Sequence, residues 1–145
     1  MNEIITLAAN IATCLMVFVA VIQIVTDKKK TRQLATMDAF EVLQKEALTV
    51  LNHADLKDLR EAKKGSDDYR TYGEALARIE HFCVGLNEKV YDKGIFYQIA
   101  HNYFDRGTLR DRMDILMDKK GKEHYENILR VLAWMKEYSG KSQNS

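Results

Sequence analysis

The chain has no proline, only two cysteines among its 145 residues, and no glycine between Thr26 and Lys64. Two cysteines, Cys14 and Cys83, exclude a disulfide framework and agree with a reducing compartment. The shortage of helix breakers, together with the many Ala, Leu, Lys, Glu and Met residues, favours helix over strand. These absences predict an all-α protein.

Motifs of metal, nucleotide and redox sites are also missing. The four histidines include no pair four residues apart, so the sequence has no H-E-x-x-H motif, and it also lacks a P-loop, a G-x-G-x-x-G fingerprint and a C-x-x-C pair. Glu80, His81 and Cys83 are close in sequence, but residues two apart on a helix point to different sides. The sequence therefore predicts no catalytic residue, no metal site, no cofactor and a non-enzymatic role.

One long stretch lacks charge altogether. Residues 4–25 read IITLAANIATCLMVFVAVIQIV, which is 22 residues without a charge, a proline or a glycine. As a helix this stretch is about 33 Å long, enough to cross a hydrocarbon core of about 30 Å. A cleaved signal peptide would have a basic N-terminal flank and a shorter apolar stretch, and a buried core helix ending in three lysines would be unusual. We therefore predict a transmembrane anchor over residues 1–27.

The flanks of the anchor predict its orientation. The N-terminal flank has no Lys or Arg, whereas residues 28–35 form a basic juxtamembrane segment. Lys and Arg remain on the cytoplasmic side, so we expect a protein of the cell (cytoplasmic) membrane with its N-terminus outside and residues 28–145 in the cytoplasm. Membrane lipids are then the first expected partner, because four cations of the segment can contact anionic headgroups: Lys28, Lys29, Lys30 and Arg32.

Within the predicted span, residues recur at alternating spacings of four and three, which is a heptad stripe. Its members are Thr6, Asn10, Thr13, Val17, Ala20 and Ile24. An Asn in lipid commonly pairs with another helix. The stripe therefore predicts self-association, or pairing with another membrane protein, through Thr6, Asn10 and Thr13. The alternative is that Asn10 lies near enough to the outer interface to be hydrated.

Residues 28–145 have the length of one domain and hold all 22 Lys and Arg but 19 of the 21 Asp and Glu. Basic residues gather between Arg106 and Lys122, just after Tyr103 and Phe104, as at a surface that meets RNA or lipid phosphates. The interleaved aspartates indicate instead a solvated face with ion pairs between neighbouring helical turns. Nucleic acid is therefore not an expected partner.

Apolar residues in this region recur with a helical period. The expected helices are 36–51, 55–64, 70–89, 95–105, 108–120 and 123–138. We expect a compact bundle of five or six short helices in a cytoplasmic domain at 36–139, with Met37 and Val90 on buried faces and a disordered tail at 140–145. Thr36 suits an N-cap. Nothing after Val25 forces a break, however, so the membrane helix can continue into the domain as a stalk.

Three short motifs carry a family resemblance: R-I-E-x-F-x-x-G at 78–85, V-Y-D at 90–92 followed by Ile95, and A-T-M-D at 35–38. They resemble a family of small bacterial membrane-anchored helical proteins, the domain of unknown function 4760 type. The resemblance implies one membrane helix, a basic flank and a helical bundle, and it implies no activity. Four positions stand out, for function or as a buried ion pair, a packing glycine and a helix N-cap: Arg78, Glu80, Gly85 and Asp92.

Two functional interpretations follow. The leading one is a single-pass bacterial membrane protein, non-enzymatic, whose cytoplasmic helical domain binds a protein partner or forms a homo-oligomer. The alternative is a membrane-tethered effector, such as a toxin or a phage-defence component, that acts on the bilayer or on RNA. Toxicity lost on Asn10→Leu would favour an assembled span, and toxicity kept by residues 28–145 alone would favour a soluble activity.

Overall fold

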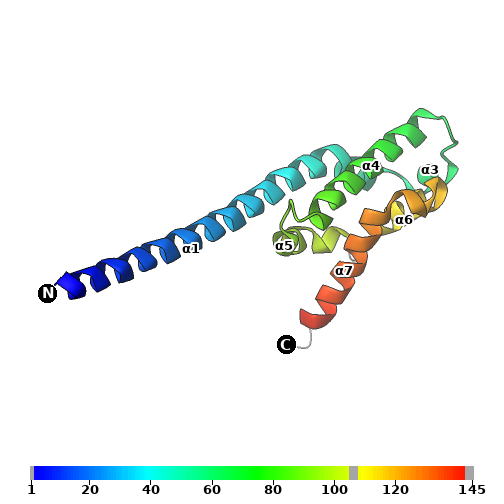
Figure 1. Ribbon diagram of the computed structural model, residues 1–145. Helices are drawn as coiled ribbons and strands as arrows, with labels where there is room; N and C mark the ends of the chain where they lie inside the picture. The colour runs from blue at the N-terminus through cyan, green and yellow to red at the C-terminus, as the bar shows by residue number, and fades with distance from the viewer. Residues whose placement is uncertain (1, 105–107, 143–145) are drawn as a thin grey trace.

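The computed structural model describes the backbone of residues 2–104 and 108–142 and the side chains of residues 11–104 and 108–140. Throughout these residues the fold is all-α, with one long helix leading into a bundle, as predicted (Figure 1). The helices are α1 (Asn2–Leu43), η1 (Gln44–Leu48), α2 (Thr49–His53), α3 (Leu56–Glu61), α4 (Asp67–Asn87), α5 (Lys93–Phe104), α6 (Thr108–Lys120), η2 (Lys122–His124) and α7 (Glu126–Ser142).

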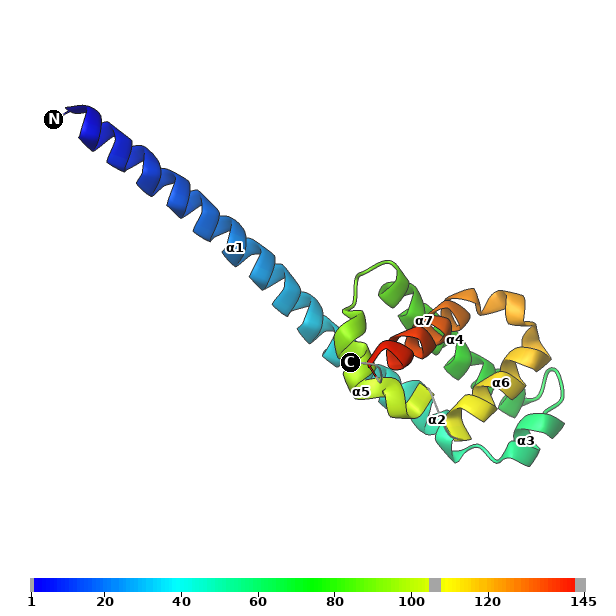
Figure 2. The same ribbon diagram turned by 90° about the horizontal axis from the view of Figure 1, so that it is seen from below.

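A single helix, α1, joins the apolar stretch to the bundle, and the predicted stalk is confirmed (Figure 2). The π-helix η1 and then α2 prolong it directly to His53. The described part of this rod, Ile11–His53, contains an 18-residue window of mean hydropathy 1.8, none of which is buried in the bundle. The rod is therefore long and apolar enough to cross a membrane, and the fold is compatible with a single-pass membrane protein.

The inner end of the rod forms one wall of the hydrophobic core. Phe40, Leu43, Ala47, Leu48 and Leu51 are buried there. The Phe40 ring contacts the rings of α4 and α5, with centroid distances of 6.2 Å to Phe82 and 6.1 Å to Phe96. Burial of such aromatic side chains supplies much of a small core's stability. Residues 11–32 of α1 are all exposed, so over its described side chains the helix changes from exposed to buried along its length.

Helices α1 and α4 are antiparallel. Arg78 of α4 pairs with Glu46 of η1, while farther along the chain the backbone N–H of Asp92 donates to the Thr36 hydroxyl at 2.7 Å. Thr36 precedes Glu46 in the rod, whereas its partner Asp92 follows Arg78 in the chain, so the two segments run in opposite directions. The α4–α5 turn, residues 88–92, consequently lies on the side of the bundle nearest the apolar end of α1 (Figures 1 and 2).

Several helix ends are capped by side chains. Asp55 accepts from the N–H of Lys57 at 2.7 Å at the start of α3, and Ser66 accepts from the N–H of Tyr69 at 3.2 Å at the start of α4. Such caps satisfy N–H groups that the first helical turn leaves without partners. The Asp55 cap thus starts α3 after the end of α2, and the Ser66 cap starts α4 after the end of α3.

Four details of the sequence prediction are wrong. Thr36 is not an N-cap: it is buried inside α1, and its hydroxyl donates to the carbonyl of Arg32 at 2.7 Å. Met37 and Val90 are 50% and 59% exposed, because the rod packs through the Thr36–Phe40 side and the chain leaves α4 before Val90. Helix α7 continues to Ser142, so it extends into the tail predicted at 140–145, of which residues 143–145 lie outside the described part.

Candidate interaction surfaces

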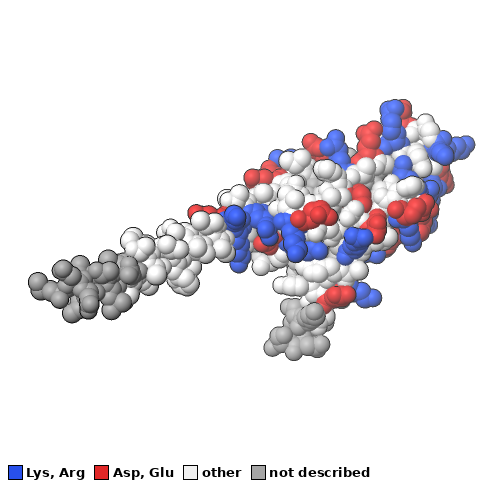
Figure 3. Space-filling view, viewed as in Figure 1, with Lys and Arg blue, Asp and Glu red and all other residues white. Residues whose placement is uncertain are grey.

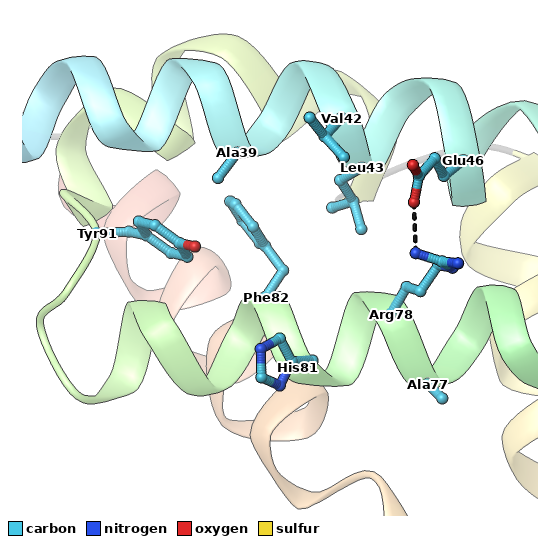
Figure 4. A pocket seen from close by; sticks show the side chains of 9 residues that line it. All are labelled: Ala39, Val42, Leu43, Glu46, Ala77, Arg78, His81, Phe82 and Tyr91. Atoms are coloured by element: carbon cyan, nitrogen blue, oxygen red, sulfur yellow. Dashed lines mark hydrogen bonds and ion pairs between the residues drawn. The ribbon is translucent and has the colours of Figure 1, made fainter.

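A groove of about 510 Å³ runs between the rod and α4, and we name it the α1–α4 groove. Its lining is mostly apolar and comprises Ala39, Val42, Leu43, Glu46, Ala77, Arg78, His81, Phe82 and Tyr91. Figure 4 shows Leu43 and Phe82 directed into the space between the two helices, with Tyr91 at one end and the Glu46–Arg78 pair at the other. An apolar floor with charge at one end suits an amphipathic helix.

The Glu46–Arg78 pair differs from the buried ion pair expected at Arg78. The two side chains are 47% and 57% exposed, so water screens the attraction and the pair adds at most about 1 kcal/mol. Both charges remain available to a molecule that enters the α1–α4 groove. Sequence reasoning missed Glu46, because no local spacing links it to a residue 32 positions away.

A second groove of about 530 Å³ lies where the rod enters the domain, and we name it the juxtamembrane groove. It is lined by Ile24, Asp27, Lys28, Thr31, Arg32, Ala35, Lys89 and Val90. Figure 3 shows the Lys and Arg side chains gathered at this junction. Lys28 and Arg32, both predicted headgroup contacts, thus lie beside the α4–α5 turn, while Lys29 and Lys30 are exposed elsewhere on the rod.

The other family-like residues do not converge. Glu80 is half-buried and caps α7: its carboxylate accepts from the N–H of Asn127 at 3.0 Å, from the Asn127 side-chain amide at 2.7 Å and from the N–H of Ile128 at 2.9 Å. A carboxylate at a helix N-terminus also meets the positive end of the helix dipole. Glu80 therefore joins α4 to α7 and does not pair with Arg78.

Gly85 and Asp92 have the packing and capping roles that the sequence offered as alternatives to function. A Cβ atom on Gly85 would lie 2.6 Å from Cδ2 of the Tyr91 ring. The Asp92 carboxylate accepts from the N–H of Ile95 at 3.0 Å at the start of α5. These two residues shape the turn between α4 and α5. Neither the Asp92 carboxylate nor the Tyr91 ring beside Gly85 forms a reactive site with Arg78.

Cys83 is buried in the core, and burial raises the pKa of its thiol, with the charge of Glu80 adding to the effect. A protonated thiol is a poor nucleophile. His81 is exposed on α4. Within residues 11–104 and 108–140, no group of three or more His, Cys, Asp or Glu side chains is placed to hold a metal ion.

The basic stretch of α6 is used in contacts within the domain. Arg110 pairs with Asp114 at 2.9 Å, and Lys122 pairs with Asp118 at 2.7 Å. Lys119 donates to the carbonyls of Leu59 and Ala62, at 2.9 and 2.8 Å, and so closes the C-terminal end of α3. Arg106 lies outside the described residues. These pairings fit the solvated face predicted from the interleaved aspartates.

Of the residues predicted to associate within the span, only Thr13 has a described side chain, and it is exposed on α1. The side chains of Thr6 and Asn10 lie outside the described residues. A comparison of the chain with models of protein families, with curated proteins and with solved structures finds no match.

Proposed function

We propose that this chain is a non-enzymatic, single-pass membrane protein whose rod holds a helical interaction domain against the cytoplasmic face of the membrane. The observation that carries the proposal is the continuity of α1. The helix passes from an exposed apolar stretch to the buried Thr36, Phe40 and Leu43 without a break. A helix that is part of the domain's core cannot act as a flexible tether, so the anchor sets the position of the domain.

The cytoplasmic side is supported by the distribution of Lys and Arg. No Lys or Arg precedes residue 28, and four follow by residue 32, which is the asymmetry that retains a flank in the cytoplasm. The family resemblance, to anchored helical proteins of bacteria, is in line with this arrangement.

Partner binding is supported by the α1–α4 groove, whose exposed apolar wall includes Val42. The proposed partner contributes an amphipathic helix, with apolar side chains over Val42 and Phe82 and polar groups toward Glu46 and Arg78. Self-association belongs to the outer half of the span, through Thr6, Asn10 and Thr13. Contact there leaves the inner half of the rod and both grooves accessible.

The anchor is tested by alkaline carbonate extraction of membranes that contain the full chain. We expect the protein to remain in the membrane fraction. We also expect a reporter cysteine at Lys64→Cys, placed in the domain, to react with a membrane-impermeant maleimide only after the cytoplasmic face is opened. Release by carbonate would disprove the span, and labelling of intact cells would disprove the orientation.

The groove is tested by site-specific photocrosslinking in the same membranes. A crosslinker at Val42 should capture a defined partner, and a crosslinker at the equally exposed Leu34, outside the α1–α4 groove, should capture much less. The substitution Arg78→Glu should reduce capture from Val42, because it reverses the charge at one end. Equal capture from Val42 and Leu34 would rule out the groove as the binding surface.

A further inference from the structure

The α4–α5 turn contains a lysine where a helix of this kind normally ends in glycine. The N–H of Val90 donates to the carbonyl of Gly85 at 2.9 Å, and the N–H of Lys89 donates to that of Leu86 at 3.4 Å. This pair of bonds is a Schellman motif, in which the residue directly after the helix C-cap adopts a left-handed backbone conformation. Lys89 takes that place with φ of 60°, although a side chain there is unfavourable compared with glycine.

The next residue departs from the usual motif as well. In a Schellman motif the apolar residue that follows the left-handed one commonly packs against the last helical turn. Here the corresponding position of that turn is Gly85, which is covered by the Tyr91 ring, and Val90 stays exposed. Stability alone favours a glycine and a covered side chain at these two positions, and such departures from local rules are typical of functional surfaces.

The turn lies at the height where a membrane surface would be. The juxtamembrane groove joins Lys89 and Val90 to Ile24, which belongs to the apolar stretch, and to Lys28 and Arg32. At about 1.5 Å per residue, Lys28 and Arg32 are within about 12 Å of Ile24 along the rod. The headgroup layer on each side of a bilayer is about 5–8 Å thick. The groove therefore spans the headgroup layer when α1 crosses the membrane.

The charge of the juxtamembrane groove is positive. Lys28, Arg32 and Lys89 line it with a single acidic residue, Asp27. Among the residues that the structure describes, none of these three cations forms an ion pair. Cations left without a partner around a groove at this height are complementary to a phosphate group carrying negative charge.

We propose that the juxtamembrane groove binds the phosphate of an anionic phospholipid headgroup, such as that of phosphatidylglycerol, between Lys28, Arg32 and Lys89. Val90 enters the interface beside the acyl chains. The proposal rests on the membrane span proposed above and adds a second attachment point, contributed by the domain. Rod and turn then contact the same headgroup from two sides of the juxtamembrane groove.

The test uses the full chain in lipid nanodiscs of phosphatidylcholine with a rising content of phosphatidylglycerol. A fluorophore is attached at Glu88→Cys, which keeps Lys89 and Val90, in a Cys14→Ser background, and the nanodiscs contain a lipid with a quencher in its headgroup. We expect quenching that increases with the phosphatidylglycerol content. A fluorophore at Lys64→Cys, beyond the opposite end of α4, should show no such increase.

Two variants identify the groups responsible. Lys89→Gln should weaken the phosphatidylglycerol dependence about fivefold, since one lysine near an anionic surface is worth about 1 kcal/mol. The matched control Lys57→Gln, an exposed lysine on α3, should leave it unchanged. Lys89→Gly removes the charge while easing the backbone, so it should weaken lipid binding although the melting temperature stays the same or rises. Loss of lipid binding without a loss of stability separates binding from folding.

Several outcomes would overturn the proposal. Equal quenching at positions 88 and 64 would do so, as would a Lys89→Gln variant that responds like the wild type. Competition by millimolar inorganic phosphate would indicate a soluble anion site. Quenching that does not depend on lipid charge would show that the turn approaches the bilayer without binding an anionic headgroup. Carbonate extraction separates this failure from that of the proposed function, because a chain that stays in the membrane without these responses loses only the lipid site.

Discussion

Single residues of α4 hold this small domain together, and Glu80 is the clearest case because one carboxylate satisfies three donors at the start of α7. Glu80→Ala should lower the free energy of unfolding by about 1–3 kcal/mol, since two backbone N–H groups lose their acceptor. Chemical denaturation in detergent, followed by the fluorescence of Trp134 in α7, measures this. Glu74→Ala, an exposed residue of the same helix, should cost less than about 0.5 kcal/mol; equal effects would contradict the capping role.

The two glycines within α4 should respond oppositely to alanine. Gly85→Ala places a methyl group against the Tyr91 ring, which is stacked on Phe82 with centroids 5.0 Å apart, so we expect a loss of about 1–3 kcal/mol. At Gly73 the atoms nearest to the new methyl belong to the flexible end of the Lys120 side chain, whose Cε lies 2.8 Å away, and the helix propensity of Ala should give a gain of up to about 1 kcal/mol.

A double-mutant cycle checks this explanation at Gly85. In a Tyr91→Ala background, Gly85→Ala should cost less than it does in the wild type, by about 1 kcal/mol or more, since the obstructing ring is gone. The same free energy change in both backgrounds would mean that the methyl group meets something other than Tyr91.

Cys83 provides a prediction about pH. Burial raises the pKa of its thiol in the folded domain, whereas in the unfolded chain the thiol ionises near its ordinary pKa of about 8.5. Cys83 thus contributes full stability below that pH, and the contribution declines above it by up to about 1.4 kcal/mol per pH unit. The advantage of the wild type over Cys83→Ala should therefore shrink above about pH 9, when both are unfolded by denaturant. A stability advantage of the wild type that does not change with pH would contradict this prediction.

At the scale of helices, one hydroxyl provides a hydrogen bond between the rod and the α4–α5 turn. Thr36 donates to the carbonyl of Arg32 and accepts from the N–H of Asp92. Thr36→Val keeps the shape but leaves that N–H without its acceptor, at a cost of about 1–3 kcal/mol. Hydrogen exchange should accelerate at residues 88–93, while Thr36→Ser should remain close to the wild type. Protection that is unchanged in Thr36→Val would show that the turn is held by other contacts.

The elements themselves were largely predictable from the sequence, and their partners were not. Apolar residues at helical spacing gave the face of α4 with Leu76, Ile79, Phe82, Cys83 and Leu86, all of which are buried. The predicted N-cap at Thr36 was wrong because a threonine side chain can either cap a helix or form a hydrogen bond within one. Only the packing of α4 against the rod decides between these two roles. Arg78 and Glu80 reach different elements because residues two apart diverge on a helix.

The two grooves were not predictable from the sequence either, because each is lined by residues that lie far apart in the chain. The lysines of the basic segment suggested headgroup contacts, but Lys89 lies far away in sequence, and nothing local brings it to Lys28. One signal was present: a lysine and a valine follow the end of a helix where glycine and a covered residue are usual. That signal is visible only once the end of α4 is known.

At the scale of the whole molecule, the rod should behave as a rigid body with the domain. Spin labels at Val17→Cys and Lys64→Cys, in a Cys14→Ser background, should give one narrow distance distribution in nanodiscs when measured by pulsed electron paramagnetic resonance. Inserting Gly-Gly-Gly after Arg32 should broaden it, because glycine breaks the helix between anchor and bundle. A broad distribution in the chain without the insertion would show a hinge that the continuous α1 excludes.

For a span that crosses the membrane as proposed, the continuity of α1 also determines how often the domain meets a partner. A domain on a flexible tether explores a half-sphere above the membrane, whereas one fixed to a span explores only the cone set by the span's tilt, on average about 20°. The same number of molecules then occupies a thin layer at one height. The effective concentration toward any partner at that height rises accordingly, and a partner whose binding segment lies higher above the bilayer is excluded by geometry alone.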